Sequence, residues 1–165
     1  MPKKSDNFRP DPSGASKVRD KVTLVNIILN KSILKVSRDA HLLYEEENSN
    51  RIISQTRKGV NIIETKPVGT IFWVDCFFGF RDVIENKKTK DVEVLFTLEA
   101  TFKLTYELRN RNHITKNDVA SFGVLNGPYN AWPYWREFHQ NTMLRAGLPP
   151  IILDLMLPSV VSKKG

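Results

Sequence analysis

Two long segments in the middle of the chain alternate between apolar and polar residues. In Ile71–Asp82 the even-numbered positions from 72 to 80 are all apolar, and in Val92–Leu108 the same holds from 92 to 106. Alternation with a period of two predicts strands with one buried face and one solvent-exposed face. A polar turn over residues 86–90 lies between the two segments, so together they predict a long antiparallel hairpin.

Two further strands are predicted before this hairpin. Thr23–Val36 is rich in Val, Ile and Leu and lacks helix-capping signals, which favours a strand. Val60–Thr65 predicts a short strand that ends before Pro67. The polar stretch Ser37–Lys58 between them predicts a long crossover.

The pattern changes after the hairpin. The Thr-x-x-Asp sequence at 115–118 is a helix start signal of the capping-box kind, and Asn-Gly-Pro at 126–128 predicts the end of that helix. A second helix is predicted from Pro133 to Gly147. The following segment, Leu148–Pro158, is apolar but rich in proline, so it predicts an irregular apolar strap.

This order of four strands, two helices and a strap predicts an α+β fold with an antiparallel sheet. The length of 165 residues suits one domain. We expect a single domain over residues 23–158, a flexible basic tail over 1–22 and a flexible tail over 159–165. No apolar run is long enough to span a bilayer and the N-terminus lacks a signal peptide, so we expect a cytoplasmic protein.

The net charge of +7 raises the question of nucleic acid binding. Residues 1–22 carry six bases and three acids, and Lys163 and Lys164 add two more bases, so the body of the chain is left with about +2. The phenylalanines of the hairpin share a face with Val and Leu, which favours burial over base stacking. A basic nucleic-acid-binding module therefore stays a remote alternative.

The residues give no sign of catalysis, and we expect no enzyme activity, cofactor or metal. His41, His113 and His139 are far apart and none has the spacing of a metal-ligand pair. The single cysteine, Cys76, lies among apolar strand positions and predicts a buried, unreactive thiol. The sequence also lacks a glycine-rich phosphate loop and a serine nucleophile elbow.

The chain instead has more apolar surface than two short helices can cover. Ile71, Trp73 and Phe77 even place large apolar groups on the second face of one strand. Such surface predicts either subunit packing or a groove for extended apolar peptide.

The C-terminal third resembles a known family. Asn130–Glu137, which reads NAWPYWRE, and Arg145–Leu153, which reads RAGLPPIIL, are similar to the corresponding part of SecB, a tetrameric bacterial export chaperone. The likeness covers roughly Leu24 to Pro158, and its specific part is Pro133–Leu153. It implies a homotetramer, assembled as a dimer of dimers, that holds unfolded polypeptides in long apolar grooves.

The resemblance also implies site residues. Clients would lie between the sheet, the crossover and the strap, where the crossover contributes an aromatic residue. Carried onto this sequence, the groove-lining residues would be Tyr44, Val94, Phe96, Leu98, Ala100, Leu148, Ile151 and Leu153.

One surface departs from the family. SecB docks onto the SecA motor through acidic residues of its sheet, and this chain has Lys31, Lys35 and Thr97 where those acids are expected. Charge reversal at a contact costs on the order of 2–5 kcal/mol where the pair is buried. Engagement of SecA is therefore doubtful.

The sequence thus predicts an ATP-independent holdase that binds exposed hydrophobic segments of unfolded polypeptides. Some members of the family are encoded with toxin–antitoxin pairs, so the client could be a dedicated antitoxin. The alternative is a preprotein export chaperone that delivers clients to the Sec translocase.

Overall fold

The computed structural model of the chain describes residues 8–45, 51–63, 70–85 and 89–156. The strap, described as far as Met156, follows the last helix without helix or strand of its own. In chain order the elements are α1 (Pro12–Arg19), β1 (Val22–Val36), α2 (Ala40–Leu43), β2 (Ile52–Ile63), β3 (Ile71–Glu85), β4 (Val92–Leu108) and α4 (Lys116–Arg145).

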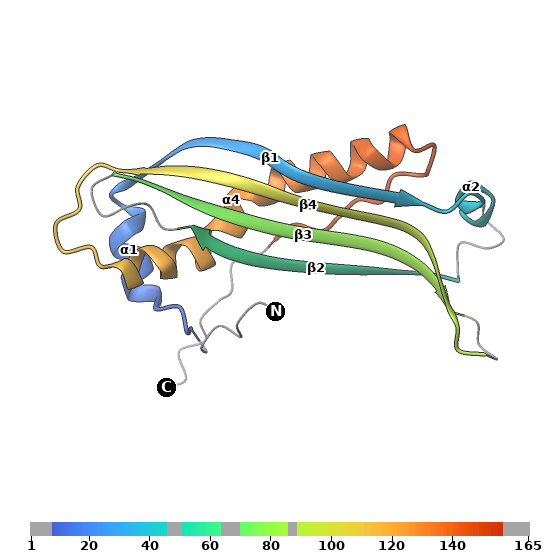
Figure 1. The fold of residues 1–165 in the computed structure, drawn as a ribbon, viewed down its shortest axis with the longest axis horizontal. Helices are drawn as coiled ribbons and strands as arrows, with labels where there is room; N and C mark the ends of the chain where they lie inside the picture. The colour runs from blue at the N-terminus through green and yellow to red at the C-terminus, as the bar shows by residue number, and fades with distance from the viewer. Residues whose placement is uncertain (1–7, 46–50, 64–69, 86–88, 157–165) are drawn as a thin grey trace.

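The four strands form one antiparallel sheet in the order β1-β4-β3-β2. The helix α4 runs along one face, which we call the inner face, and the opposite outer face carries no described helix (Figure 1). The even-numbered residues of β3 point inward from Phe72 to Phe80, and Phe78 stacks on Trp135 of α4 with ring centroids 5.6 Å apart. The predicted α+β fold and the long hairpin are therefore confirmed.

The long helix corrects the prediction of two helices. α4 is continuous over 30 residues and passes through Pro128 and Pro133. Gly127 marks a close approach and not a break, because a Cβ there would lie 2.9 Å from Val74 Cγ1 and 3.1 Å from Cys76 Sγ. Packing against the sheet thus outweighs the local cost of two prolines in a helix.

The two ends of α4 follow the sequence signals. Thr115 accepts a hydrogen bond from the Asp118 amide and Asp118 accepts one from the Thr115 amide, which completes the predicted capping box. At the other end Gly147 adopts a φ of 72°, a left-handed conformation that glycine takes without strain. Within the described residues, no helix combines the length and the apolar composition that crossing a membrane requires.

The strand β2 begins at Ile52, well before the predicted start at Val60. The side chains of residues 53–59 are exposed, because β2 lies at the edge of the described sheet and pairs only with β3. An edge strand that is exposed to solvent on both faces lacks the apolar alternation by which a buried strand is identified. The crossover is therefore shorter than predicted and contains the helical turn α2.

The first helix lies in a segment that we predicted to be a mobile tail. α1 packs on the N-terminal part of α4 (Figure 1), with Ala15 4% and Val18 0% exposed. The expectation of a flexible tail over 1–22 is therefore wrong for α1. Residues 1–7 and the predicted C-terminal tail lie outside the described residues.

Candidate functional site

Most of the predicted groove residues lie in the core of the protomer. Phe96 and Leu98 are 0% exposed, Ala100 is 1% exposed, and Leu148 and Leu153 of the strap are 3% and 8% exposed. α4 and the strap together cover the inner face at these positions. These five residues therefore do not line an open groove of the described protomer, and their part in client binding stays a prediction.

The other three predicted residues have different environments. Val94 is exposed, and Ile151 is partly buried against the core. Tyr44 donates a hydrogen bond to Asp82, which is fully buried and also accepts one from Ser54 Oγ at 2.6 Å. Burial raises the pKa of Asp82, and the two hydrogen bonds oppose this shift. Tyr44 thus anchors the crossover to the sheet.

An open groove lies instead along β2, and we call it the β2 groove. Its volume is about 540 Å³, and α1, β2, the N-terminal half of α4 and the end of the strap form its walls. Most of its lining is apolar or uncharged. The lining residues are Pro12, Ala15, Ser16, Arg19, Lys58, Gly59, Val60, Val124, Leu125, Asn126, Pro128, Tyr129 and Met156.

The wall formed by α1 is fixed by polar contacts at its N-terminus. Asp11 caps the helix by accepting hydrogen bonds from the Ser13 hydroxyl and from the Ser13 and Gly14 amides, and these bonds lower the pKa of its carboxyl group. The Asp11 amide donates to Ser121 Oγ of α4 at 2.9 Å. These contacts join α1 to α4, so one wall of the β2 groove is formed by a segment that we predicted to be a flexible tail. The sequence signal for this helix is Asp11 at the N-cap followed by Pro12 at the first helical position.

The other wall presents the free edge of the sheet. Gly59 of β2 is exposed and lines the groove, so the strand backbone is accessible there. Within the described sheet, β2 has no partner strand on this side. A strand edge with unpaired amide and carbonyl groups is a template for pairing with an extended peptide. Arg19 and Lys58 add positive charge among the groove-lining residues.

The strap is held against α4 by a hydrogen bond. Trp132 Nε1 donates to the carbonyl oxygen of Asp154 at 2.9 Å. Leu153 next to it is buried, whereas Ile152 and Leu155 are 71% and 69% exposed. The strap therefore closes the inner face and still presents apolar side chains at the surface.

The residues of the altered docking surface come together on the outer face. Lys35 of β1 lies opposite Thr97 of β4, and Lys31 lies opposite Thr101. Both lysines are exposed. The sequence comparison therefore singled out one continuous surface.

The reactive side chains of the core are inaccessible. Cys76 is 0% exposed, and burial raises the pKa of its thiol to about 12. His139 is also 0% exposed, and burial lowers the pKa of its imidazole to about 4. Within the described residues, no group of three or more His, Cys, Asp or Glu side chains could hold a metal ion.

Comparison with known proteins establishes the fold. No family model and no curated protein matches the sequence. The SecB-like chaperone Rv1957 of Mycobacterium tuberculosis, solved in complex with a ChAD peptide from the antitoxin HigA1, superposes with a TM-score of 0.71. It is 16% identical, and the match covers 88% of this chain and 97% of that chain. A protein of unknown function from Streptococcus agalactiae reaches a TM-score of only 0.39 at 9% identity, over 82% of this chain and 98% of that one. The chain thus has the SecB-like fold.

Proposed function

We propose that this protein is an ATP-independent holdase chaperone that binds exposed hydrophobic segments of unfolded polypeptides. The observation that carries the proposal is the β2 groove, an apolar channel beside a free strand edge in a SecB-like fold. The similar chaperone of known structure is bound to an antitoxin peptide, so we infer an aggregation-prone antitoxin as the first client to test. Export of preproteins is the alternative role for the same groove.

Physical chemistry accounts for binding without a catalytic step. Each Val or Leu side chain that a client buries in the groove contributes about 1.5–3 kcal/mol, offset by the entropy lost when the client becomes ordered. Main-chain hydrogen bonds to the β2 edge do not depend on the client sequence. The protein therefore needs no nucleotide, cofactor or metal: a bound client is withheld from aggregation and released when it folds or meets its partner.

Assembly into a homotetramer, as a dimer of dimers, is part of the proposal. α4 leaves the inner side of β1 uncovered, and Leu24, Leu29 and Leu34 are 38%, 44% and 47% exposed there. β1 is also the second edge of the described sheet. An apolar strand edge of this kind is suited to burial between subunits. Light scattering coupled to size-exclusion chromatography should give a tetramer for the wild type and smaller species for Leu34→Asp.

The outer face bears on the choice between clients. Lys31 and Lys35 are exposed where an acidic surface would be needed to dock SecA, so delivery to the translocase is the weaker proposal. Capture of clients from cells of the source organism separates the two roles. A dedicated chaperone recovers one dominant antitoxin, whereas an export chaperone recovers many preproteins.

A variant pair tests where the client binds. Val124 lines the β2 groove without belonging to the core, and Val94 is the exposed member of the residues that the sequence predicted to line the client groove. A carboxylate in an apolar groove leaves a charge to be desolvated when the client binds. We expect Val124→Asp to weaken suppression of aggregation of a denatured client by about tenfold or more, and Val94→Asp to act like the wild type. The reverse result would refute the β2 groove, and a wild type without any suppression would refute the chaperone function.

A further inference from the structure

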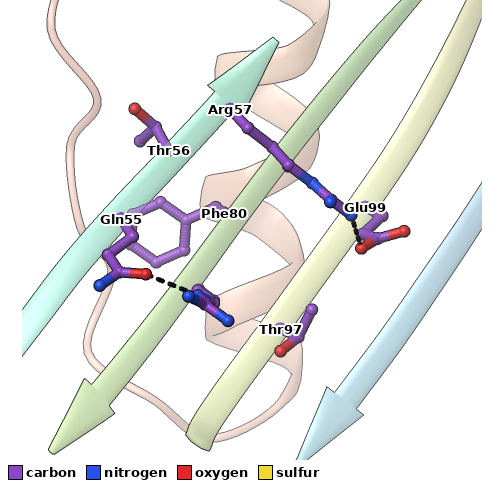
Figure 2. A pocket seen from close by; sticks show the side chains of 8 residues that line it. Gln55, Thr56, Arg57, Phe80, Thr97 and Glu99 are labelled. Atoms are coloured by element: carbon purple, nitrogen blue, oxygen red, sulfur yellow. Dashed lines mark hydrogen bonds and ion pairs between the residues drawn. The ribbon is translucent and has the colours of Figure 1, made fainter. Parts of the chain in front are cut away.

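The outer face of the sheet carries a hollow surrounded by positive charge. The hollow has a volume of about 340 Å³, and Gly79 of β3 is one of its lining residues. Figure 2 shows side chains that line it, among them Arg57 and Glu99. Arg57, Arg81 and Glu99 are among the residues that line it, and Lys31 and Lys35 of β1 lie beside it. We call these five residues the basic patch. Four cations against one carboxylate give the patch a net charge of +3.

The single carboxylate of the patch is already paired. Figure 2 shows the Arg57 side chain crossing β3 to form an ion pair with Glu99 on β4. Gly79 permits this crossing, because a Cβ there would lie 2.7 Å from Arg57 Cγ and 2.8 Å from Arg57 Nε. Glu99 is thereby occupied, although it lies between the two lysines in the sheet register.

The remaining cations have no acidic partner within the described residues. Arg81 donates from Nε to Gln55 Oε1 at 2.6 Å, and neither it nor Lys31 nor Lys35 forms an ion pair there. Thr97 lies between Lys35 and Arg81 in one row across three strands, so these two cations are about 10 Å apart at their backbones. Lys31 and Lys35 are about 13 Å apart along β1.

We propose that the basic patch docks an acidic, extended segment of a partner protein. Carboxylates spaced along an extended chain can reach cations at these separations, and the hollow over Gly79 accommodates a side chain beside the Arg81 guanidinium.

Nucleic acid fits less well, because the Phe77 ring beside the patch is covered by the Arg57 guanidinium, 4.8 Å from the ring centroid, and cannot stack on a base. The patch and the β2 groove use opposite sides of the sheet. Partner docking therefore does not depend on the client function and can occur while a client is held.

The test measures binding of a fluorescein-labelled decapeptide of alternating Glu and Ser to the full chain by anisotropy. The Gln-for-Glu peptide and a single-stranded oligothymidylate serve as comparison probes. Lys31→Glu combined with Lys35→Glu should weaken binding of the acidic peptide by about tenfold or more. Arg51→Glu combined with Arg145→Glu changes the net charge equally at exposed positions outside both the basic patch and the β2 groove, and it should retain wild-type affinity.

Both lysines lie on β1, the edge strand that we propose to pack between subunits, so their substitution could also change assembly. Arg81→Gln on β3 therefore serves as a second variant. This variant should also weaken binding of the acidic peptide, and it should leave the oligomeric state and the thermal unfolding midpoint unchanged. Equal losses in the two double variants would overturn the proposal, since they would indicate attraction by net charge alone. Tighter binding of the oligothymidylate than of the acidic peptide, or no binding of the acidic peptide, would also overturn it.

Discussion

The buried histidine of α4 makes folding stability depend on pH. His139 is 0% exposed and lies within an aromatic cluster, with its ring centroid 4.3 Å from Phe80, 5.6 Å from Trp135 and 6.3 Å from Phe96. Neither ring nitrogen has a hydrogen-bond partner with good geometry, and the backbone of Ile151 offers at most a weak one. The cluster therefore accepts the neutral imidazole and disfavours the charged form.

The size of the effect follows from the two protonation equilibria. The pKa of His139 is about 4 in the folded protein and 6.5 without burial. Between these values the unfolded chain binds the proton and the folded chain does not, so stability falls as the pH falls. The loss is about 2 kcal/mol at pH 5 and about 3 kcal/mol well below pH 4.

Urea unfolding between pH 7.5 and pH 5 measures this loss. The variant His139→Phe keeps an aromatic ring in the cluster and removes the titration, so the curve of stability against pH should become flatter by about 2 kcal/mol over that range. Any packing cost of the larger ring is the same at every pH and cancels in the slope. His41→Gln, at an exposed position of α2, should keep the wild-type slope. Parallel curves for His139→Phe and the wild type would refute the reasoning.

Three further substitutions test the packing of α4, the crossover and the strap. Gly127→Ala should destabilise the protein by about 1–3 kcal/mol, because its methyl group must displace β3 side chains, and unchanged urea unfolding would contradict this close approach. Tyr44→Phe removes a hydrogen bond to buried Asp82 and should cost about 1–3 kcal/mol in the same assay, whereas an unchanged midpoint would show that the bond does not stabilise the fold. Trp132→Phe frees the carbonyl of Asp154, so limited proteolysis should cut the strap faster, and an unaltered rate would show that the strap is held by other contacts.

The sequence was sufficient to predict the strands β3 and β4, because apolar residues occupy every second position along them. Their inner residues are buried beneath α4 and most of their outer residues are partly exposed, so the alternation is visible without a structure. β2 could not be identified in the same way, because residues 53–59 are exposed on both faces of an edge strand. Its position depends on pairing with β3, which is a contact between residues distant in the sequence.

The helices show where local signals mislead. Gly127, Pro128 and Pro133 weaken a helix locally, yet contact with β3 keeps α4 continuous. The opposite holds for α1, where the signal at Asp11 and Pro12 was present but an eight-residue helix is stable only when it is docked.

The predicted client-binding residues and the open groove differ for a related reason. Sequence alternation shows that Phe96 and Leu98 face inward, but it does not show how completely α4 and the strap cover them. Two walls of the β2 groove, α1 and β2, come from segments that the pattern missed or predicted only in part. The outer-face lysines were easier to place, because two residues four apart on one strand share a face unless a bulge intervenes.

Photo-crosslinking tests the central claim most directly. A photoreactive phenylalanine derivative is placed at position 124 in the β2 groove and, as the matched control, at position 94 of β4, an exposed position outside that groove. The probe is a reduced and carboxymethylated protein that stays unfolded. The account predicts a crosslink from Val124→photoreactive Phe that an excess of unlabelled unfolded protein abolishes, and none from the Val94 variant. A crosslink from position 94 without one from position 124 would contradict it.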